Sequence, residues 1–243
     1  MGLRDDGKTW ADIEPIIRPS VVCIASEIKG KWYTASGFVV SGKLVVTNHH
    51  VVADGPTLAN QVWFRFDNES RVRARSVVHI DEQTDLAILA VDKLPEYAKP
   101  LRLFAGQARS GEEVAAYGHP IGLDFTFTPG YVSSLREGAD LPGTRKGSWV
   151  QHTAPISSGN SGGPLVDKDG NVVAVNSWRF MDHESLGGDV QNLNFAISVG
   201  DLRTALNALD PADEVELKEE DPSAANEPRD SQIDEIFNSF NES

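Results

Sequence analysis

Ser-Gly-Asn-Ser-Gly-Gly-Pro-Leu, residues 158–165, is the stretch that determines how the rest of the chain is interpreted. Its glycines disfavour a helix or a strand interior, because glycine loses much backbone entropy in regular structure. They permit a crowded turn in which backbone N–H groups converge on one point. Ser161 lies inside that turn and becomes a nucleophile if a neighbouring base removes its proton. The alternative is a surface turn between two strands, since Gly/Ser-rich turns are common.

The composition indicates a folded protein with an acidic end. The chain has 243 residues, 40% of them hydrophobic, and a formal net charge of -14. Residues 211–243 hold 11 acidic and 2 basic residues, so most of the negative charge belongs to this tail. No basic patch is visible, which argues against nucleic-acid binding. No apolar run reaches the ~18 residues of a membrane span, so no such span is expected.

The N-terminus and the cysteine content bear on the cellular compartment. Residues 1–15 lack the apolar core of a secretory signal. The protein is therefore expected to be cytoplasmic if residue 1 is the native start and exported if an upstream signal was removed, and the localisation stays unknown. The single cysteine, Cys23, excludes an intramolecular disulfide and fits a reducing compartment. It lies in an apolar run and is expected to be an inert core residue.

Short runs of β-branched and aromatic residues, separated by turn residues, fill the chain from Ser20 to about residue 200. Roughly a dozen short strands at this spacing favour barrels or a sandwich over alternating βα units. We expect six strands before about residue 100 and six after the connection 93–111. The expected strands are 20–28, 32–40, 43–47, 62–67, 71–80 and 86–92, followed by 112–118, 125–135, 148–153, 163–166, 171–178 and 192–199.

The N-terminal residues 1–19 form a polar lead-in with one helix signal. Thr9 can cap a short helix that contains Trp10 and the isoleucines that follow, and Pro15 limits its length. We expect Trp10 to pack against its own chain, and the alternative is a contact between subunits.

Two segments follow the last expected strand. Residues 201–209 predict a helix with Asp201 as its cap and one apolar stripe. Residues 211–243 are acidic and linker-like, and we expect them to be disordered. Their apolar residues recur at helical spacing at positions 233, 236, 237 and 240. The alternative to a frayed tail is therefore an amphipathic segment that docks on this protein or on a partner.

A serine nucleophile needs a base within hydrogen-bond reach, and His50 is the best candidate. It stands at the end of an apolar strand, where side chains leave the barrel wall. His49 points in the opposite direction, so only one of the two can serve. His79 lies within an expected strand and is interpreted as structural. His152 lies close to Ser161 in the sequence and is a competitor, unless it is a strand residue beside the active loop.

The base in turn needs a carboxylate, and Asp85 stands directly before the apolar strand 86–92. Burying a carboxylate without a partner is costly, whereas one bonded to a histidine is satisfied and fixes its tautomer. Asp81 and Glu82 are nearby alternatives, but both have the character of exposed turn residues.

His50, Asp85 and Ser161, in this chain order, resemble the catalytic triad of the chymotrypsin-like serine proteases. The flanking motifs look like those of the HtrA/DegP branch. The resemblance covers about residues 15–209. Its motifs are residues 36–40, 44–52, 84–89, 117–123, 130–133, 159–165 and 194–198.

The resemblance implies an all-β fold of two six-stranded antiparallel β-barrels, about 20–100 and 111–200. These lie in a trypsin-like serine protease domain, residues 20–210, which ends in the short helix 201–209. The acidic tail follows it. HtrA proteases usually continue into PDZ domains, whereas this tail is too short and too polar for one, so PDZ-based peptide capture is not expected.

The resemblance also implies a serine endopeptidase that hydrolyses protein substrates, unfolded ones included, in quality control or regulatory proteolysis. His50 would accept the Ser161 proton, and Asp85 would orient His50. The backbone N–H groups of Gly159 and Ser161, with Asn160 between them, would bind the oxyanion. No cofactor is needed, and the sequence contains no metal-ligand cluster and no phosphate-binding loop.

For substrate specificity, the resemblance places Pro155 at the base of the pocket for the P1 side chain. An uncharged residue there argues against a trypsin-like preference. The strand residues Asn176, Ser177, Trp178 and Arg179 would form the opposite wall. Because Arg179 stands where digestive proteases have glycine, we expect a small or medium aliphatic P1 residue.

Two further function classes stay open, and so does the oligomeric state. One is a catalytically silent relative that binds polypeptides in a chaperone-like role. The other is an interaction protein that acts through its acidic tail. Family members are often trimers, so the resemblance implies a homotrimer to which the segment around Trp10 would contribute.

Overall fold

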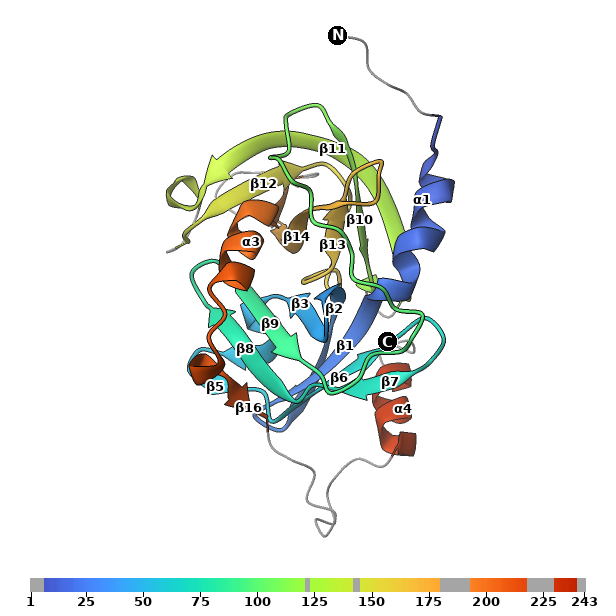
Figure 1. Ribbon diagram of the computed structural model, residues 1–243, viewed down its shortest axis with the longest axis vertical. Helices are drawn as coiled ribbons and strands as arrows, with labels where there is room; N and C mark the ends of the chain where they lie inside the picture. The colour runs from blue at the N-terminus through green and yellow to red at the C-terminus, as the bar shows by residue number, and fades with distance from the viewer. Residues whose placement is uncertain (1–6, 121–122, 142–144, 180–192, 218–229, 240–243) are drawn as a thin grey trace, which may run out of the picture.

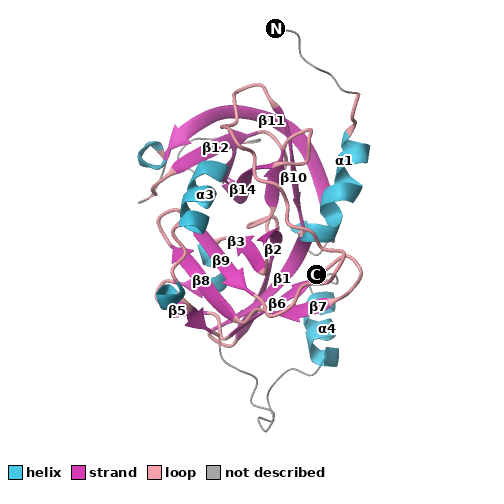
Figure 2. Cartoon of the chain, viewed as in Figure 1, coloured by secondary structure: helices cyan, strands magenta, loops and turns pink. Residues whose placement is uncertain are grey.

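A computed structural model describes residues 7–120, 123–141, 145–179, 193–217 and 230–239. Within these residues two large antiparallel sheets follow one another along the long axis of the molecule, and the helices lie at their edges (Figures 1 and 2). The expected all-β class and the expected order of strands are confirmed. The first sheet, however, differs from a six-stranded closed barrel.

The first sheet has eight strands in the order β16-β8-β9-β3-β2-β1-β6-β7, and it is open. Its strands are β1 (Val21–Ile28), β2 (Lys31–Ser41), β3 (Leu44–Thr47), β6 (Gln61–Arg65), β7 (Arg71–Arg73), β8 (Ser76–Asp81), β9 (Leu86–Ala90) and β16 (Val215–Glu216). The short strands β4 (Ala53–Asp54) and β5 (Thr57–Leu58) form a separate pair. The sheet curls around a core that includes Ile24, Phe64 and Leu89.

The expected strand 71–80 is in fact two strands, and this explains why the first sheet is curled and not closed. The chain bends at Ala74 and Arg75. The Ala74 N–H donates to the Val62 carbonyl at 2.9 Å, and the Arg75 N–H donates to the Ala90 carbonyl at 2.8 Å. The two edges of the sheet therefore meet at a chain corner instead of in a continuous ladder.

The second sheet is a closed barrel of six strands in the order β10-β11-β12-β15-β14-β13, as expected. Its strands are β10 (Glu113–Gly118), β11 (Thr126–Glu137), β12 (Ser148–His152), β13 (Pro164–Val166), β14 (Val172–Arg179) and β15 (Asn194–Ser198). The β13–β14 hairpin turns at Gly170, whose φ of 75° suits glycine. The Gly170 N–H donates to the Asp167 carbonyl at 3.0 Å.

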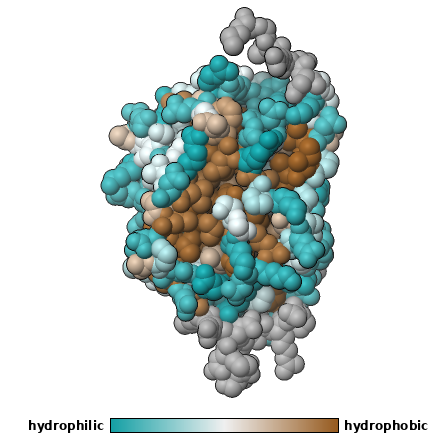
Figure 3. Space-filling view, in the orientation of Figure 1, coloured by the Kyte–Doolittle hydropathy of each residue, from teal (hydrophilic) through white to brown (hydrophobic). Residues whose placement is uncertain are grey.

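A hydrophobic core shared by both sheets holds them together. Phe38 and Leu86 of the first sheet meet Tyr117 and Trp149 of the barrel, and all four are almost completely buried. Burying side chains of this size contributes about 1.5–3 kcal/mol each. Figure 3 shows apolar residues across the middle of one face, where the two sheets meet.

The N-terminal helix α1 (Trp10–Ile17) joins this shared core. Its start is capped as expected, since the Thr9 N–H donates to the Asp12 carboxylate at 2.8 Å. Ile13 and Ile17 are fully buried. Trp10 packs on Phe127 of its own chain, with ring centroids 5.5 Å apart.

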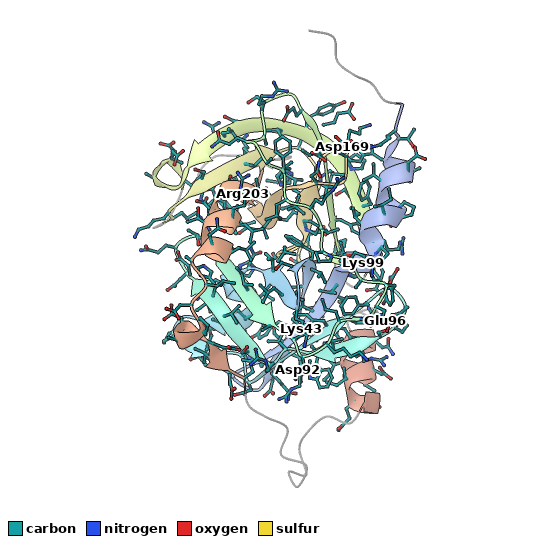
Figure 4. All side chains as sticks on the ribbon, in the orientation of Figure 1. Lys43, Asp92, Glu96, Lys99, Asp169 and Arg203 are labelled. Carbon is teal, nitrogen blue, oxygen red and sulfur yellow. The ribbon has the colours of Figure 1, made fainter. Side chains whose placement is uncertain are left out.

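The helix α3 (Val199–Asn207) begins two residues before the expected position, and Asp201 is not its cap. Ser198 caps it by accepting the Gly200 N–H at 3.1 Å. Asp201 instead accepts the Ser148 N–H at 2.7 Å, which ties α3 to β12. Arg203, labelled in Figure 4, donates to the carbonyls of Phe104 and Ala105 at 3.0 and 2.7 Å and so ties α3 to the connection between the sheets.

The acidic tail contains a docked helix, α4 (Asp230–Ser239), so the expectation of disorder fails for these residues. Ile233 and Phe237 are 0% and 2% exposed and pack with Cys23 and Trp63 on the outside of β1 and β6 (Figure 1). The Arg65 guanidinium lies 5.1 Å from the Phe237 ring centroid. The burial of the apolar stripe therefore stabilises a helix in this segment despite its acidic composition.

None of the helices in the described parts is long and apolar enough to cross a membrane.

We predict that undocking α4 exposes Cys23. Burial raises the pKa of this thiol to about 12, so the native protein should react slowly with a thiol reagent at mildly alkaline pH. Replacing both Ile233→Ala and Phe237→Ala should accelerate modification by about tenfold or more, measured with a chromogenic disulfide reagent. Glu235→Ala, on the exposed side of the same helix, is the control. Equal rates in all three proteins would contradict the docking.

Candidate active site

The four-residue helix α2 (His49–Val52) carries the two adjacent histidines, and both line one cleft. His49 is 7% exposed, whereas the His50 side chain is 49% exposed. The helix is tied to Asp85, because the His49 N–H and the Asn48 side-chain amide both donate to the Asp85 carbonyl, at 3.1 and 3.0 Å. This tether brings the end of β3 beside the start of β9.

Asp85 accepts hydrogen bonds from three directions. Its carboxylate lies 2.9 and 3.0 Å from His50 Nδ1, accepts the His50 N–H at 3.2 Å, and accepts the Ser177 hydroxyl at 2.5 Å. Burial by itself raises the pKa of Asp85, but the nearby His50 and these hydrogen bonds outweigh it and lower the pKa below its ordinary value. The stability that this ionised carboxylate contributes is therefore present above the ordinary aspartate pKa and is lost as the pH falls through the lowered value.

The backbone at Asp85 is left-handed, with a φ of 55°. Such a conformation costs about 1–3 kcal/mol in a non-glycine residue, although aspartate tolerates it better than most. It turns the carboxylate toward His50 while the Asp85 carbonyl holds α2. Asp81 and Glu82, the other carboxylates considered, do not contact His50 within the described hydrogen bonds.

Ser161 lies in the same cleft, and its hydroxyl donates to the Ser177 carbonyl at 2.9 Å. Among the described contacts, no hydrogen bond joins this hydroxyl to His50. Catalytic hydrogen bonds are often absent or long without substrate. Ser177, expected only as a wall of the substrate pocket, therefore touches both Asp85 and Ser161.

The turn before Ser161 leaves two backbone donors free. The Asn160 N–H donates to the Ser157 carbonyl at 3.0 Å, and Gly159 has a φ of 99°. A turn with positive φ at its third residue is of type II, which favours glycine there. Asn160 thus uses its N–H inside the turn, while the N–H groups of Gly159 and Ser161 have no acceptor among the described residues.

Ser36, on β2 of the first sheet, holds this turn in place. Its N–H donates to the Ser161 carbonyl at 2.9 Å, and its hydroxyl donates to the Gly159 carbonyl at 2.6 Å. The same hydroxyl accepts the His119 N–H at 2.9 Å. The approach is close at Gly162, where a Cβ would lie 2.2 Å from the Ser36 carbonyl oxygen. The sequence offered no signal for this role of Ser36.

A cleft of about 690 Å³ surrounds His50, Asp85 and Ser161. Gly159, Ser177 and Trp178 also line it, as does Arg145 from the loop before β12, which the sequence did not single out.

Not all of the expected substrate-binding residues reach this cleft. Pro155 is exposed and outside its lining, and its carbonyl accepts the Thr128 hydroxyl at 2.7 Å. Asn176 is fully buried and donates to the Pro164 carbonyl at 3.1 Å. Arg179 ends β14, and its side chain lies outside the described part. The P1 preference inferred from Pro155 and Arg179 therefore stays a prediction.

His49 also lines the cleft but is buried, whereas His79 and His152 lie outside its lining. His183 lies outside the described residues. His152 is fully buried in β12, and burial lowers its pKa to about 3, so it is neutral at physiological pH. His79 is half-buried on β8, where burial lowers its pKa despite Asp81.

One cluster in the described residues has the side chains of a metal site. Potential ligand atoms of Cys23, His119 and Asp124 lie within 4.8 Å of one another. The almost completely buried Arg65 donates to both carboxylate oxygens of Asp124 at 2.7 Å, so a cation among these side chains would meet a guanidinium. A buried ion pair that joins the two sheets accounts for the cluster.

Comparisons with known proteins agree with this geometry. Residues 35–175 match the family model described as a trypsin-like peptidase domain. Human serine protease HTRA4 is 38% identical over 154 residues, which cover 62% of this chain and 31% of that protein. A probable periplasmic serine endoprotease, DegP-like, from Pseudomonas fluorescens is 34% identical over 168 residues, 68% of this chain and 32% of that protein. The chain thus spans about a third of the length of these curated relatives.

Solved structures show the same likeness. The active form of the Rv3671c protease from M. tuberculosis superposes with a TM-score of 0.69 at 30% identity, covering 83% of this chain and 87% of that chain. The HtrA-type protease AlgW with a tripeptide gives a TM-score of 0.68 at 29% identity, covering 82% and 62%. This chain therefore belongs to the trypsin-like serine peptidase family and is a relative of the HtrA/DegP serine proteases.

Proposed function

We propose that the chain is a serine endopeptidase with His50, Asp85 and Ser161 as its catalytic triad. The observation that carries the proposal is the His50–Asp85 pair at 2.9 Å, in one cleft with Ser161 and the free N–H groups of Gly159 and Ser161. A nucleophile, an oriented base and an oxyanion site then surround one point, which is the arrangement that acyl transfer requires.

The reaction begins with a rotation of the Ser161 hydroxyl away from the Ser177 carbonyl toward Nε2 of His50. Nε2 accepts the proton as Ser161 Oγ bonds to the peptide carbonyl carbon. His50 then donates this proton to the leaving amine, and the C–N bond breaks to form an acyl-enzyme. Water, deprotonated by His50, hydrolyses the acyl-enzyme and regenerates Ser161. Asp85 holds Nδ1 of His50 as the donor and stabilises the imidazolium.

The oxyanion of the tetrahedral intermediate binds to the N–H groups of Gly159 and Ser161. One such donor contributes about 10²–10³ in rate. Because the type II turn at Ser157–Asn160 already presents these groups, no reorganisation is required when charge develops.

Protein substrates are proposed from the relatives, whose names describe serine proteases and periplasmic endoproteases. Quality control or regulatory proteolysis is the corresponding role. A catalytically silent polypeptide binder is the alternative, and the preformed oxyanion turn favours the enzyme. A homotrimer stays a prediction from the resemblance, which sedimentation velocity would test.

We predict that Ser161→Ala lowers kcat on casein or a fluorogenic peptide by roughly 10⁵–10⁶-fold. It should also abolish labelling by a fluorophosphonate probe, because the probe bonds to an activated serine oxygen. Ser158→Ala, in the exposed part of the same turn, should keep its labelling. Labelling that survives in Ser161→Ala, or is absent from the folded wild type, would refute the proposed enzyme.

We predict that Ser36→Ala impairs catalysis beyond its effect on folding. It leaves the Gly159 carbonyl without its donor, so the oxyanion turn loosens and kcat should fall by about 10- to 100-fold. The free energy of unfolding should fall by about 1–2 kcal/mol.

The matched control is Ser20→Ala. Ser20 is also a buried serine, and its hydroxyl bonds the carbonyl and the N–H of Lys99 outside the cleft lining. The Ser20→Ala variant should show a similar fall in the free energy of unfolding and an unchanged kcat. Equal kcat values in the two variants would show that Ser36 is only structural.

A further inference from the structure

Arg145 is a cleft residue that the proposed mechanism does not use. It lies in the segment between the short helix Gly138–Asp140 and β12. Two bonds fix the residue after Arg145, Lys146, beside the cleft. The Lys146 N–H donates to the Gln83 carbonyl at 2.9 Å, and the Trp149 indole N–H donates to the Lys146 carbonyl at 2.8 Å. Arg145 therefore stands beside the turn that leads into Asp85.

The guanidinium of Arg145 rests on two indole rings. It lies 4.5 Å from the ring centroid of Trp178 and 5.2 Å from that of Trp149. Contacts through the faces of the rings orient the planar group and leave N–H groups at its edge for a ligand. Its Nε is buried and has no hydrogen-bond partner in the described part of the chain.

Arg145 also lacks a carboxylate partner among the described ion pairs. Other arginines have one, for example Arg65 with Asp124 and Arg109 with Glu112. Burial lowers the pKa of Arg145, although Asp85 partly opposes this effect, and the group stays cationic at physiological pH. A partly desolvated cation without a partner is stabilised when an anion binds beside it.

The other charged or titratable groups of the cleft do not supply that anion. The carboxylate of Asp85 is already bonded to His50 and Ser177. Glu82 and Asp54 line the cleft, but neither forms an ion pair with Arg145 within the described residues. Among the described residues the Arg145 guanidinium therefore has no carboxylate partner, and a bound molecule can supply one.

The position of Arg145 indicates which molecule this is. The Ser177 carbonyl accepts the Ser161 hydroxyl, and the guanidinium of Arg145 packs on the ring of the next residue, Trp178. β14 is bonded to the turn around Ser161 through Asn176, whose N–H donates to the Gly163 carbonyl and whose carbonyl accepts the Gly162 N–H. The next residues, Ser177 and Trp178, line the cleft. An extended peptide bound beside Ser161 therefore passes these residues. Since an extended peptide advances about 3.3 Å per residue, side chains within about four residues of the scissile bond reach this region.

We propose that Arg145 is a specificity-determining residue that favours polypeptides with an Asp or Glu side chain within about four residues of the scissile bond. The carboxylate bonds to the exposed edge of the guanidinium, which Trp178 and Trp149 hold in place. This inference rests on the proposed function, because the cleft must accept a polypeptide.

The test compares peptide pairs that differ only in Glu against Gln, placed in turn at each position around the scissile bond. Binding is measured by calorimetry to the Ser161→Ala protein, and hydrolysis is measured with an intact Ser161. At one or two neighbouring positions the Glu peptide should be preferred by about tenfold in Kd and in kcat/KM. The preference should decrease with added salt.

Arg145→Gln should abolish this preference, and Arg145→Lys should keep part of it, because lysine retains the charge but not the stacked fork. Arg109→Gln is the matched control, since it removes the same charge from an exposed arginine outside the cleft lining and should keep the full preference. The ratio of kcat/KM for the Glu peptide to kcat/KM for the Gln peptide, measured on one variant, does not depend on the fraction of that protein that is folded.

A ratio that is unchanged in Arg145→Gln would overturn the inference. So would a uniform rise in the hydrolysis of all peptides, because Arg145 would then be an obstruction. Hydrolysis without any acidic preference would refute the Arg145 site alone. Binding with the preference but no hydrolysis by the wild type would refute the proposed function and leave a carboxylate-binding site.

Discussion

The hydrogen bonds of Ser36 are the interaction on which the candidate site depends. One buried serine on β2 bonds the carbonyls of Gly159 and Ser161, which lie in the loop between β12 and β13 of the barrel, and accepts the His119 N–H. The turn that carries Ser161 is therefore held by the same sheet that carries His50 and Asp85. Because Gly162 packs against the Ser36 carbonyl with no room for a Cβ, the two halves can approach closely enough for the three side chains to share a cleft.

The strained residue of the candidate site is Asp85, which the proposed mechanism uses to orient His50. Asp85 adopts a left-handed backbone, and its carboxylate is almost completely buried. Both features are unfavourable in isolation. The hydrogen bonds from His50 and Ser177, together with the apolar core between the sheets, stabilise them. The arrangement agrees with the general tendency of functional sites to contain strained residues that the surrounding structure holds in place.

Much of the fold could be predicted because β-strands and turns have local signals. The expected strands occur in order, and the second sheet closes into its barrel. The errors arose where distant contacts outweighed composition. Residues 71–80 bend because Ala74 bonds to β6 and Arg75 bonds to β9, which lie toward opposite ends of the strand order. The acidic residues 230–239 form a helix because Ile233 and Phe237 find an apolar face on the first sheet.

By itself, the sequence determined the fold class, the family and the candidate triad, because glycine-rich turns, alternating apolar residues and ordered motifs are properties of neighbouring residues. Only the tertiary structure decided how Ser36, Ser177 and Arg145 contribute. These residues belong to β2, to β14 and to the loop before β12, and their roles depend on contacts across large sequence separations. A serine or an arginine carries no local signal for such a role, since its partners exist only after the two sheets have packed against each other.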